Sequence, residues 1–399
     1  MKLLFLLLNM PDDESSSDMY TDLINEFRDN GHIVTVIAPS NHNKTGITIE
    51  RSVNVLRVKV LQTLGVRSMI KKGVGLALLP YFFKRAYKRF LKGEKFDWIF
   101  MPTPPITLID FVVYVKTRIN VKFYLILRDI HPQSSASIGL IKNRMMFNYL
   151  ATRAEKGYKI ADFIGCMSQG NIDYIANNYP ELDKNKLVLL MNWQKDVPYK
   201  NSVANIRLKF NLQHKFVALF GGNIGLGQKI ENIADLAKHY LGNKDIVFVL
   251  IGKGVAKERL QKIAVKQNLD NIRFVDFMPR SEYLDFVKSV NLGLISINEN
   301  YKVPTCPSKS VSYMSLKIPV FAMINSNNDY GEIIEKAGAG YWSVGSDKKN
   351  VYRKFDSIYS NAELRQNMGE KGYAFYKTNL TSEKAYTTII EQIDGKEKV

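Results

Sequence analysis

The sequence contains little cysteine, which excludes the folds that depend on this residue. Only Cys166 and Cys306 occur among 399 residues, and neither lies in a CxxC pair or in a cluster with histidine. Disulfide scaffolds and zinc ribbons need several cysteines at short spacing, so both are excluded. The scarcity of cysteine fits a reducing compartment.

Long hydrophobic runs are also absent. No window of the sequence approaches the ~20 apolar residues that a membrane-spanning helix needs. The apolar run at residues 3–8 is short, no small-residue cleavage site follows it, and Pro11 and Asp12 come soon after. We interpret this run as a buried first strand rather than a signal peptide, and we expect a cytoplasmic protein whose membrane contacts are peripheral.

Acidic residues are outnumbered, with 38 Asp and Glu against 56 Lys and Arg and a net charge of +18. Such a charge attracts anions, which include nucleic acid, acidic lipid and phosphorylated substrates. The sequence has no recognised nucleic-acid motif and no basic tail, so we expect no nucleic-acid partner. It also lacks HExxH, a carboxylate-rich metal loop and a serine nucleophile elbow, which argues against a metalloenzyme or a serine hydrolase.

Apolar runs alternate with amphipathic stretches along the whole chain. The runs lie at residues 2–8, 33–38, 53–60, 97–101, 122–128, 162–167, 187–191, 215–220, 245–251, 271–277, 291–297 and 319–324. They lack polar alternation, which indicates strands covered on both faces, as in a parallel sheet. The polar stretch 194–205 separates two similar series. We therefore predict an α/β protein with two doubly wound, Rossmann-like domains, residues 1–195 and 206–380, that face a central cleft.

A glycine-rich turn follows the first strand of the second domain. Its glycines are Gly221, Gly222, Gly225 and Gly227. Glycine allows a tight turn, and the helix expected to start at residues 228–231 would direct amide N–H groups toward an anion. The turn matches neither the Walker A motif nor GxGxxG, so an ordinary turn is the alternative to a phosphate site. A second pair, Gly252 and Gly254, ends the next strand at the same edge of the sheet.

The segment 303–323 is expected to form a loop, a short helix and a strand. Ser308 can cap this helix, and Lys309 lies in its first turn. The helix dipole disfavours a cation there, which suggests an anionic partner. The alternative is a solvated lysine beside an ordinary cap.

Polar residues also crowd two loops of the first domain. Arg128, Asp129 and His131 follow a buried strand, at the edge where open α/β sheets bind ligands. A lone loop histidine is often only a surface or hydrogen-bonding residue. The acidic, hydroxyl-rich loop at residues 11–18 could form an acceptor pocket, whereas its last residue, Asp18, could simply cap the next helix.

Residues 64–96 combine many basic side chains, and the single acid Glu94, with an apolar and aromatic face. This composition is typical of an interfacial helix pair attracted to anionic lipid. The alternative is a helix whose apolar side covers the sheet and whose basic side is solvated.

Four motifs in order make the sequence similar to the family-4 retaining glycosyltransferases of GT-B fold, especially the WbuB-like subgroup of capsule and O-antigen biosynthesis. They are DNGHIVTVIAP (29–39), DIHPQ (129–133), GGNIGLGQ (221–228) and PSKSVSYMSLKIPV (307–320). The resemblance implies metal-independent transfer of a hexosyl or N-acetylhexosaminyl group from a nucleotide-diphosphate sugar, UDP-linked in our interpretation. It implies a polyprenyl-pyrophosphate-linked saccharide as acceptor at the inner face of the cell membrane, and a C-terminal helix, 381–399, that crosses back to the first domain.

The resemblance also implies roles for individual residues. The catalytic residues would be His131, Asp129 and Lys309. The donor site would contain Gly222, Asn223, Ile224, Gly225, Lys253, Arg280, Ser308 and Ser312. The acceptor site would contain Asp13, Ser15, Ser16 and Arg128. The sequence departs from the family at Ser312, which occupies the place of a ribose-binding glutamate.

Two other functions compete with this interpretation. A nucleotide-sugar epimerase of the same fold would bind a similar ligand but would need carboxylates for acid-base chemistry, which the acidic loop could supply. A catalytically silent nucleotide-sugar-binding subunit would explain Ser312 as a trace of lost activity.

Overall fold

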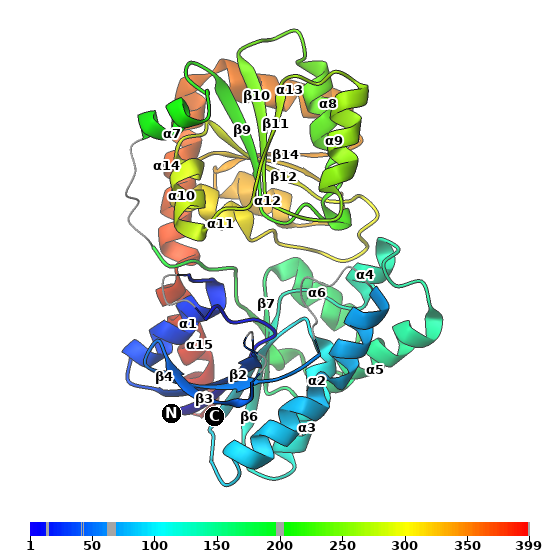
Figure 1. Cartoon of the computed structure of the whole chain (residues 1–399), viewed down its shortest axis with the longest axis vertical. Coiled ribbons are helices and arrows are strands. Elements are labelled where there is room, and N and C mark those ends of the chain that lie inside the picture. Colours follow the sequence, from blue (N-terminus) through cyan, green and yellow to red (C-terminus); the bar gives the residue numbers. More distant parts are fainter. Residues whose placement is uncertain (13–15, 41, 43, 62–68, 197–202, 398–399) are drawn as a thin grey trace. The chain divides into compact units, whose positions relative to one another are not determined.

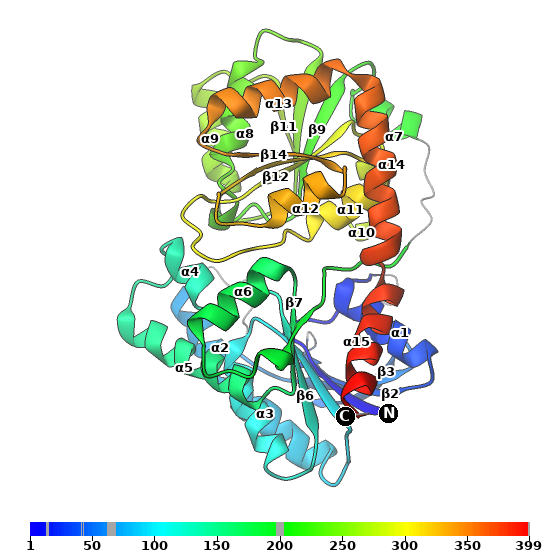
Figure 2. The ribbon, with the colours of Figure 1, turned by 180° about the vertical axis from the view of Figure 1, so that it is seen from behind.

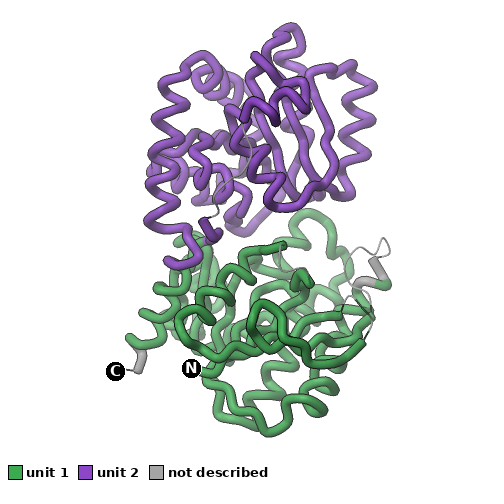
Figure 3. Tube along the Cα trace, turned by 60° about the vertical axis from the view of Figure 1, so that its left-hand side comes forward, with its two compact units in different colours: residues 1–191, 385–399 green, residues 192–384 purple. Residues whose placement is uncertain are grey.

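The computed structural model describes residues 1–12, 16–40, 42, 44–61, 69–196 and 203–397. The chain forms two compact units, shown in Figure 3. Unit 1 contains residues 1–191 and 385–399, and unit 2 contains residues 192–384. The chain therefore passes into unit 2 a few residues before the predicted boundary, and it returns to unit 1 within its last helix.

Unit 1 is built on an eight-stranded sheet with the order β3-β4-β2-β1-β5-β6-β7-β8. Its strands are β1 (Lys2–Leu6), β2 (Ile33–Pro39), β3 (Gly46–Glu50), β4 (Val53–Val58), β5 (Trp98–Pro102), β6 (Lys122–Leu127), β7 (Phe163–Cys166) and β8 (Leu187–Leu189). The described strands pair in parallel except for the edge pair β3 and β4, which is antiparallel. The strand order reverses between β1 and β5, and such a switch point is where open α/β sheets bind ligands.

Helices cover both faces of this sheet (Figures 1 and 2). They are α1 (Met19–Asp29), α2 (Met69–Phe90), α3 (Ile109–Lys116), α4 (Gln133–Ser137), α5 (Arg144–Ile160), α6 (Gln169–Asn178) and α15 (Ser382–Glu397), with short 3-10 turns η1 (Ile106–Leu108) and η2 (Lys184–Lys186). Phe27 of α1 packs on Phe5 and Phe100 of the sheet and on Tyr386 of α15. These aromatic contacts place α1 and α15 on the same face.

The basic stretch 64–96 differs from the predicted helix pair. Among its described residues it forms one helix, α2, which continues through Pro80. Phe83 and Tyr87 pack edge-on against Phe111 of α3, and Lys84 lies over the ring of Tyr114 at 4.5 Å from its centroid. Part of the apolar side of α2 therefore covers the domain, as the alternative interpretation held, whereas Val74, Leu78 and Tyr81 are 40–58% exposed. The membrane-facing role of this stretch stays a prediction.

Unit 2 contains a six-stranded parallel sheet with the order β11-β10-β9-β12-β13-β14. Its strands are β9 (Phe216–Gly221), β10 (Ile246–Ile251), β11 (Ile272–Val275), β12 (Leu292–Ser296), β13 (Val320–Ile324) and β14 (Gly340–Val344). Its helices are α7 (Val203–Lys209), η3 (Leu226–Gln228), α8 (Glu231–His239), α9 (Lys257–Lys266), α10 (Arg280–Lys288), α11 (Lys309–Ser315), α12 (Tyr330–Lys336), α13 (Lys348–Ser360) and α14 (Ala362–Asn379). The strand order reverses between β9 and β12, so the loop after β9 lies at the switch point.

The predicted fold class is confirmed, because both units are α/β layers built on largely parallel sheets. Every predicted apolar run contains a strand. Two strands were not predicted, β3 and β14. Both lie at a sheet edge. Ile49 of β3 is 78% exposed and Tyr341 and Trp342 of β14 are half-buried, so neither strand is buried on both faces like the central strands.

Candidate functional site

The glycine-rich loop at the end of β9 is locked against the loop that follows β10. The amide of Gly222 donates to the carbonyl of Ile251 at 2.9 Å, and the amide of Ile224 donates to the carbonyl of Lys253 at 3.0 Å. Gly252 has φ of +143°, and a Cβ there would lie on the carbonyl oxygen of Gly222. Glycine is therefore required at this position for the two loops to meet.

This geometry corrects part of the prediction for the loop. Gly222 and Ile224 were expected to donate their amides to a phosphate, but both amides are already used in the loop contact. These two residues shape the loop, while Asn223 and Gly225 remain the predicted amide donors. The helix expected after the loop begins at Glu231 as α8, behind the 3-10 turn at residues 226–228.

Lys309 lies beside this loop, at the first position of α11. Its Nζ donates to Oε1 of Gln228 at 2.5 Å and lies 3.9 Å from the centroid of the Phe220 ring. A Cβ on Gly222 would be 4.0 Å from its Cε, so the lysine side chain lies beside the loop. Burial lowers the pKa of Lys309 from 10.5 to about 7. Both neighbours are neutral, so the charged ammonium would be stabilised by an anion bound at the loop.

Ser308 does not cap α11, contrary to the prediction. Its side chain makes no capping hydrogen bond, because its backbone is already helical, with φ of −64° and ψ of −21°. A side chain caps a helix from an extended backbone. Ser310 instead donates to the carbonyl of Pro307 at 2.8 Å.

Ser312 is linked to the segment by which the chain enters unit 2. Its Oγ donates to Oε1 of Gln194 at 2.6 Å, and Nε2 of Gln194 donates to Oγ of Ser315 at 3.2 Å. The backbone carbonyl of Gln194 accepts from the hydroxyl of Tyr376 at 3.1 Å. The ribose-binding role of Ser312 stays a prediction, and in this structure its hydroxyl is used to hold α11 against Gln194.

The other predicted donor residues lie in neighbouring loops of the same sheet edge. Lys253 follows β10, and its Nζ lies 4.7 Å from the centroid of the Phe277 ring. Arg280 follows β11 and begins α10. The carboxyl ends of β9, β10 and β11 thus each contribute a predicted residue, which is the arrangement expected of a ligand site in a parallel sheet.

The acceptor motif in unit 1 follows the carboxyl end of β6. The carbonyl of Asp129 accepts from the His131 amide at 2.9 Å and from Oγ1 of Thr103 at 3.2 Å. Nδ1 of His131 lies 3.1 Å from Oγ of Ser135. Burial raises the pKa of Asp129 to about 6, against the opposing effect of Arg128. A carboxyl group that titrates near neutrality can exchange protons, which suits it to acid-base work.

Tyr20 belongs to the same group, although the sequence did not identify it. Burial raises its pKa to about 12, Arg128 acts in the opposite direction, and Asp18 and Asp129 add to the rise. The sequence shows Tyr20 only as one apolar position of the first helix. Its nearness to β6 depends on how α1 folds back over the sheet.

The predicted acceptor loop is described only in part. Asp13 and Ser15 lie outside the described residues. Ser16 accepts a hydrogen bond at its carbonyl from the guanidinium of Arg51. Asp18 caps α1, because its Oδ1 accepts from the amides of Tyr20 and Thr21 at 2.9 Å each.

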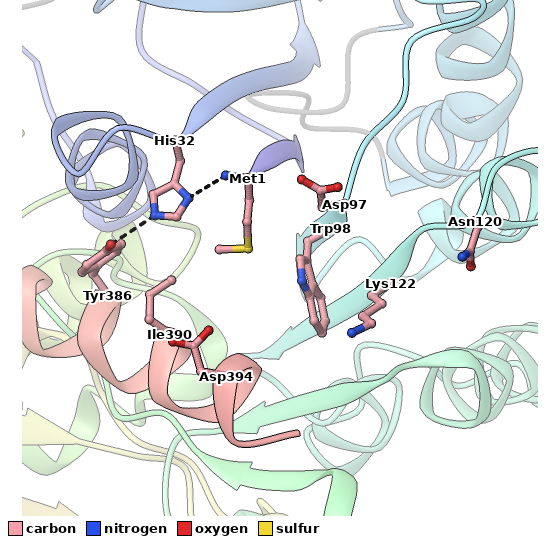
Figure 4. Close-up of a pocket in the computed structure, with 9 residues that line it drawn as sticks. All are labelled: Met1, His32, Asp97, Trp98, Asn120, Lys122, Tyr386, Ile390 and Asp394. Carbon is pink, nitrogen blue, oxygen red and sulfur yellow. Dashed lines mark hydrogen bonds between the residues drawn. The ribbon is translucent and has the colours of Figure 1, made fainter. Parts of the chain in front are cut away.

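A separate cavity in unit 1 of about 750 Å³ does not include the predicted residues (Figure 4). It is lined by His32, Asp97, Trp98 and Lys122, which lie near the amino ends of the strands, and by Tyr386 of α15. Nε2 of His32 lies 3.1 Å from the hydroxyl of Tyr386. The cavity thus lies at the edge of the sheet opposite the acceptor motif.

Two properties of the described residues concern metals and membranes. They contain no group of three or more His, Cys, Asp or Glu side chains that could hold a metal ion. None of their helices combines the length and apolar character that crossing a bilayer requires.

The part of the chain that carries the glycine loop matches a known family. Residues 204–375 match the family described as "Glycosyl transferases group 1". A curated relative, the probable glycosyltransferase WbjE of Pseudomonas aeruginosa, is 22% identical over 336 residues, which are 82% of this chain and 81% of its own. A putative colanic acid biosynthesis glycosyl transferase of Escherichia coli, WcaI, is 22% identical over 154 residues, 37% of this chain and 38% of its own.

Solved structures resemble the whole chain in fold. Sucrose-phosphate synthase from Thermosynechococcus elongatus aligns with a TM-score of 0.75 at 12% identity, over 100% of this chain and 99% of its own. HepE of Anabaena, solved with UDP, aligns with a TM-score of 0.70 at 13% identity, over 99% and 100%. WaaG, a glycosyltransferase involved in lipopolysaccharide biosynthesis, gives 0.68 at 12%, over 97% and 99%. Residues 204–375 thus match the group 1 glycosyltransferase family, and the chain as a whole shares the two-domain fold of these solved structures.

Proposed function

We propose that this protein is a retaining, WbuB-like glycosyltransferase that moves a sugar from a UDP-linked donor to a lipid-linked saccharide during surface polysaccharide biosynthesis. The observation that carries the proposal is the half-buried Lys309 beside the glycine loop of the group 1 domain, with only neutral partners at its Nζ. HepE, which shares the fold, has been solved with UDP and with UDP-glucose. The relative WcaI, named for colanic acid biosynthesis, and the structural neighbour WaaG, named for lipopolysaccharide biosynthesis, support a role in polysaccharide assembly.

The donor half of the reaction is proposed to depend on charge stabilisation. The bond between the sugar and the β-phosphate breaks, and negative charge grows on the departing diphosphate. The ammonium of Lys309 and the amides of Asn223 and Gly225 would hold this charge, and Lys253 and Arg280 would add positive potential. These groups can take the part that a divalent cation takes in other transferases, so we propose that no metal is required.

The acceptor half is proposed to use unit 1. Arg128, Asp129 and His131 would bind and orient the acceptor sugar, with the histidine held by Ser135. In a retaining transfer without a protein nucleophile, the acceptor hydroxyl attacks from the face that the diphosphate leaves, and a phosphate oxygen accepts its proton. Asp129 would then set the orientation and charge of the site rather than form a covalent bond.

The acceptor is proposed to be a saccharide on a polyprenyl pyrophosphate, met at the cytoplasmic face of the cell membrane. The net charge of +18 and the exposed basic side chains of α2 favour an anionic surface. The transferred group would be a hexose or an N-acetylhexosamine.

The test is donor binding and turnover in the purified chain. We expect UDP-sugars to raise the melting temperature, and the matching sugar to be transferred or slowly hydrolysed. Lys309→Ala should lower kcat/KM by at least about a hundredfold, whereas Lys266→Ala, an exposed lysine on α9, should leave it unchanged. Binding without turnover would favour the silent subunit, interconversion of sugar epimers would favour the epimerase, and an unchanged rate in Lys309→Ala would remove this lysine from the site.

A further inference from the structure

The first half of α5 carries large apolar side chains that face solvent. Met145 is 81% exposed, Met146 43% and Tyr149 40%, and Leu140 in the preceding loop is 40% exposed. The buried residues of α5 are Ala154, Gly157 and Tyr158, all in its second half. Met145 and Tyr149 lie one turn apart on the same face of α5, and exposed apolar side chains that adjoin one another mark an interaction surface, unlike single scattered ones.

The second half of α5 fixes the helix to unit 1. A Cβ on Gly157 would lie 2.7 Å from Cδ1 of Ile109, so the helix and α3 are in close contact. Arg153 donates to Asp110 of α3 at 2.8 Å, and its guanidinium stacks on the ring of Tyr149 at 3.5 Å. In Figures 1 and 2, α5 lies at the margin of unit 1, on the side away from α1 and α15. The exposed first half of α5 therefore extends from a second half that is packed against α3.

The segment that carries this surface is basic, and the Asp110 carboxylate that reaches it from α3 is paired with Arg153. No Asp or Glu occurs between Asp129 and Glu155, whereas Lys142 and Arg144 are both present and exposed. Arg144 is the first residue of α5, and the first turn contains no acid. The helix dipole disfavours a cation at this end, so folding alone gives no reason for it.

We propose that the start of α5, together with Leu140, inserts into an anionic lipid bilayer. Met145, Met146 and Tyr149 would enter the boundary between headgroups and acyl chains, while Lys142 and Arg144 contact headgroup phosphates. A second copy of the chain fits less well, because an isologous contact through this surface would bring the cations of both copies together.

The surface on α5 follows the acceptor motif closely in the chain. The acceptor motif at residues 129–133 leads into α4, and α4 leads directly to Leu140. Insertion here would hold the acceptor residues at the level of the lipid headgroups. This last step rests on the proposed function, whereas binding of the surface to lipid does not.

The experiment is co-sedimentation of the full chain with phosphatidylcholine vesicles with and without phosphatidylglycerol. We expect binding that needs the anionic lipid and weakens with salt. Met145→Asp with Met146→Asp should weaken partitioning by at least about tenfold, and Lys142→Gln with Arg144→Gln should weaken it about fivefold per charge at low salt. The matched control is Val265→Asp on α9, which replaces a side chain that is 78% exposed and should change nothing.

The inference is overturned if the wild type does not bind the vesicles, or if the Met145/Met146 variant binds them as well as the wild type does. In the second case, a concentration-dependent dimer that the variant abolishes would assign the surface to a second copy. UDP-sugar binding and transfer to a water-soluble acceptor should be normal in the variant, so a failure of the proposed function would appear in those assays and not in sedimentation.

Discussion

The most specific consequence of the donor site is that binding of a nucleotide sugar should take up a proton. The pKa of Lys309 is lowered to about 7 by burial, and the partners of its Nζ are the neutral Gln228 amide and the Phe220 ring. A diphosphate bound beside it would stabilise the ammonium form and raise this pKa again. The free protein therefore holds fewer protons than the complex above neutral pH.

The size of the effect follows from the fraction of charged lysine. With a pKa of about 7, roughly nine tenths of the free protein carries the ammonium at pH 6 and roughly one tenth at pH 8. Affinity for the donor should therefore fall about tenfold between these two pH values, with about 0.9 proton taken up per donor bound at pH 8. Donor binding weakens as the pH rises, because Lys309 of the free protein loses its charge as the pH passes its pKa.

The assay is calorimetric titration with UDP-glucose, whose diphosphate has no group that titrates in this range. Titrations at pH 8 in two buffers of different ionisation enthalpy give the number of protons directly. Lys309→Arg, which stays charged throughout, should bind with little dependence on pH, and Lys266→Ala should behave as the wild type. Proton uptake near zero in the wild type, or the same pH profile in Lys309→Arg, would refute the reasoning.

Three other predictions follow from single contacts. Gln194→Leu should lower the free energy of unfolding by about 1–3 kcal/mol, since Ser312 loses its acceptor, and an unchanged urea midpoint would contradict the link. Gly252→Ala should destabilise the protein by about 3 kcal/mol and abolish donor binding, because its Cβ would meet the Gly222 carbonyl; a wild-type melting temperature would argue for a looser loop. Turnover should fall as pH drops below about 6, where Asp129 becomes protonated. Asp129→Asn should remove this acidic limb from the pH profile. If the limb persists in this variant, the Asp129 carboxylate is not the group that causes it.

The sequence predicted most of the fold because the strands of a doubly wound sheet are apolar on both faces. Residues 216–221 and 246–251 are buried throughout, and each appears in the sequence as an uninterrupted apolar run. The edge strands β3 and β14 lack this pattern and were missed. The stretch 64–96 was expected to form a helix pair, but its described residues form the single helix α2, because nothing in its composition marks where one helix ends and another begins. Its membrane-facing role stays a prediction.

The candidate site was predicted less completely. Glycine spacing identified the loop after β9, but the sequence could not show that Gly222 and Ile224 donate to the next loop. Tyr20 and Gln194 were missed because each acquires its neighbours only when distant segments fold together. Such long-range contacts leave no local pattern in a single sequence.

The most direct test of the account is a structure of the full chain in complex with UDP or a UDP-sugar. The account predicts that the diphosphate lies within hydrogen-bond distance of Nζ of Lys309 and of the amides of Asn223 and Gly225, at the carboxyl end of β9. A nucleotide bound instead in the unit 1 cavity lined by His32 and Trp98, or a diphosphate that does not contact Lys309, would contradict it.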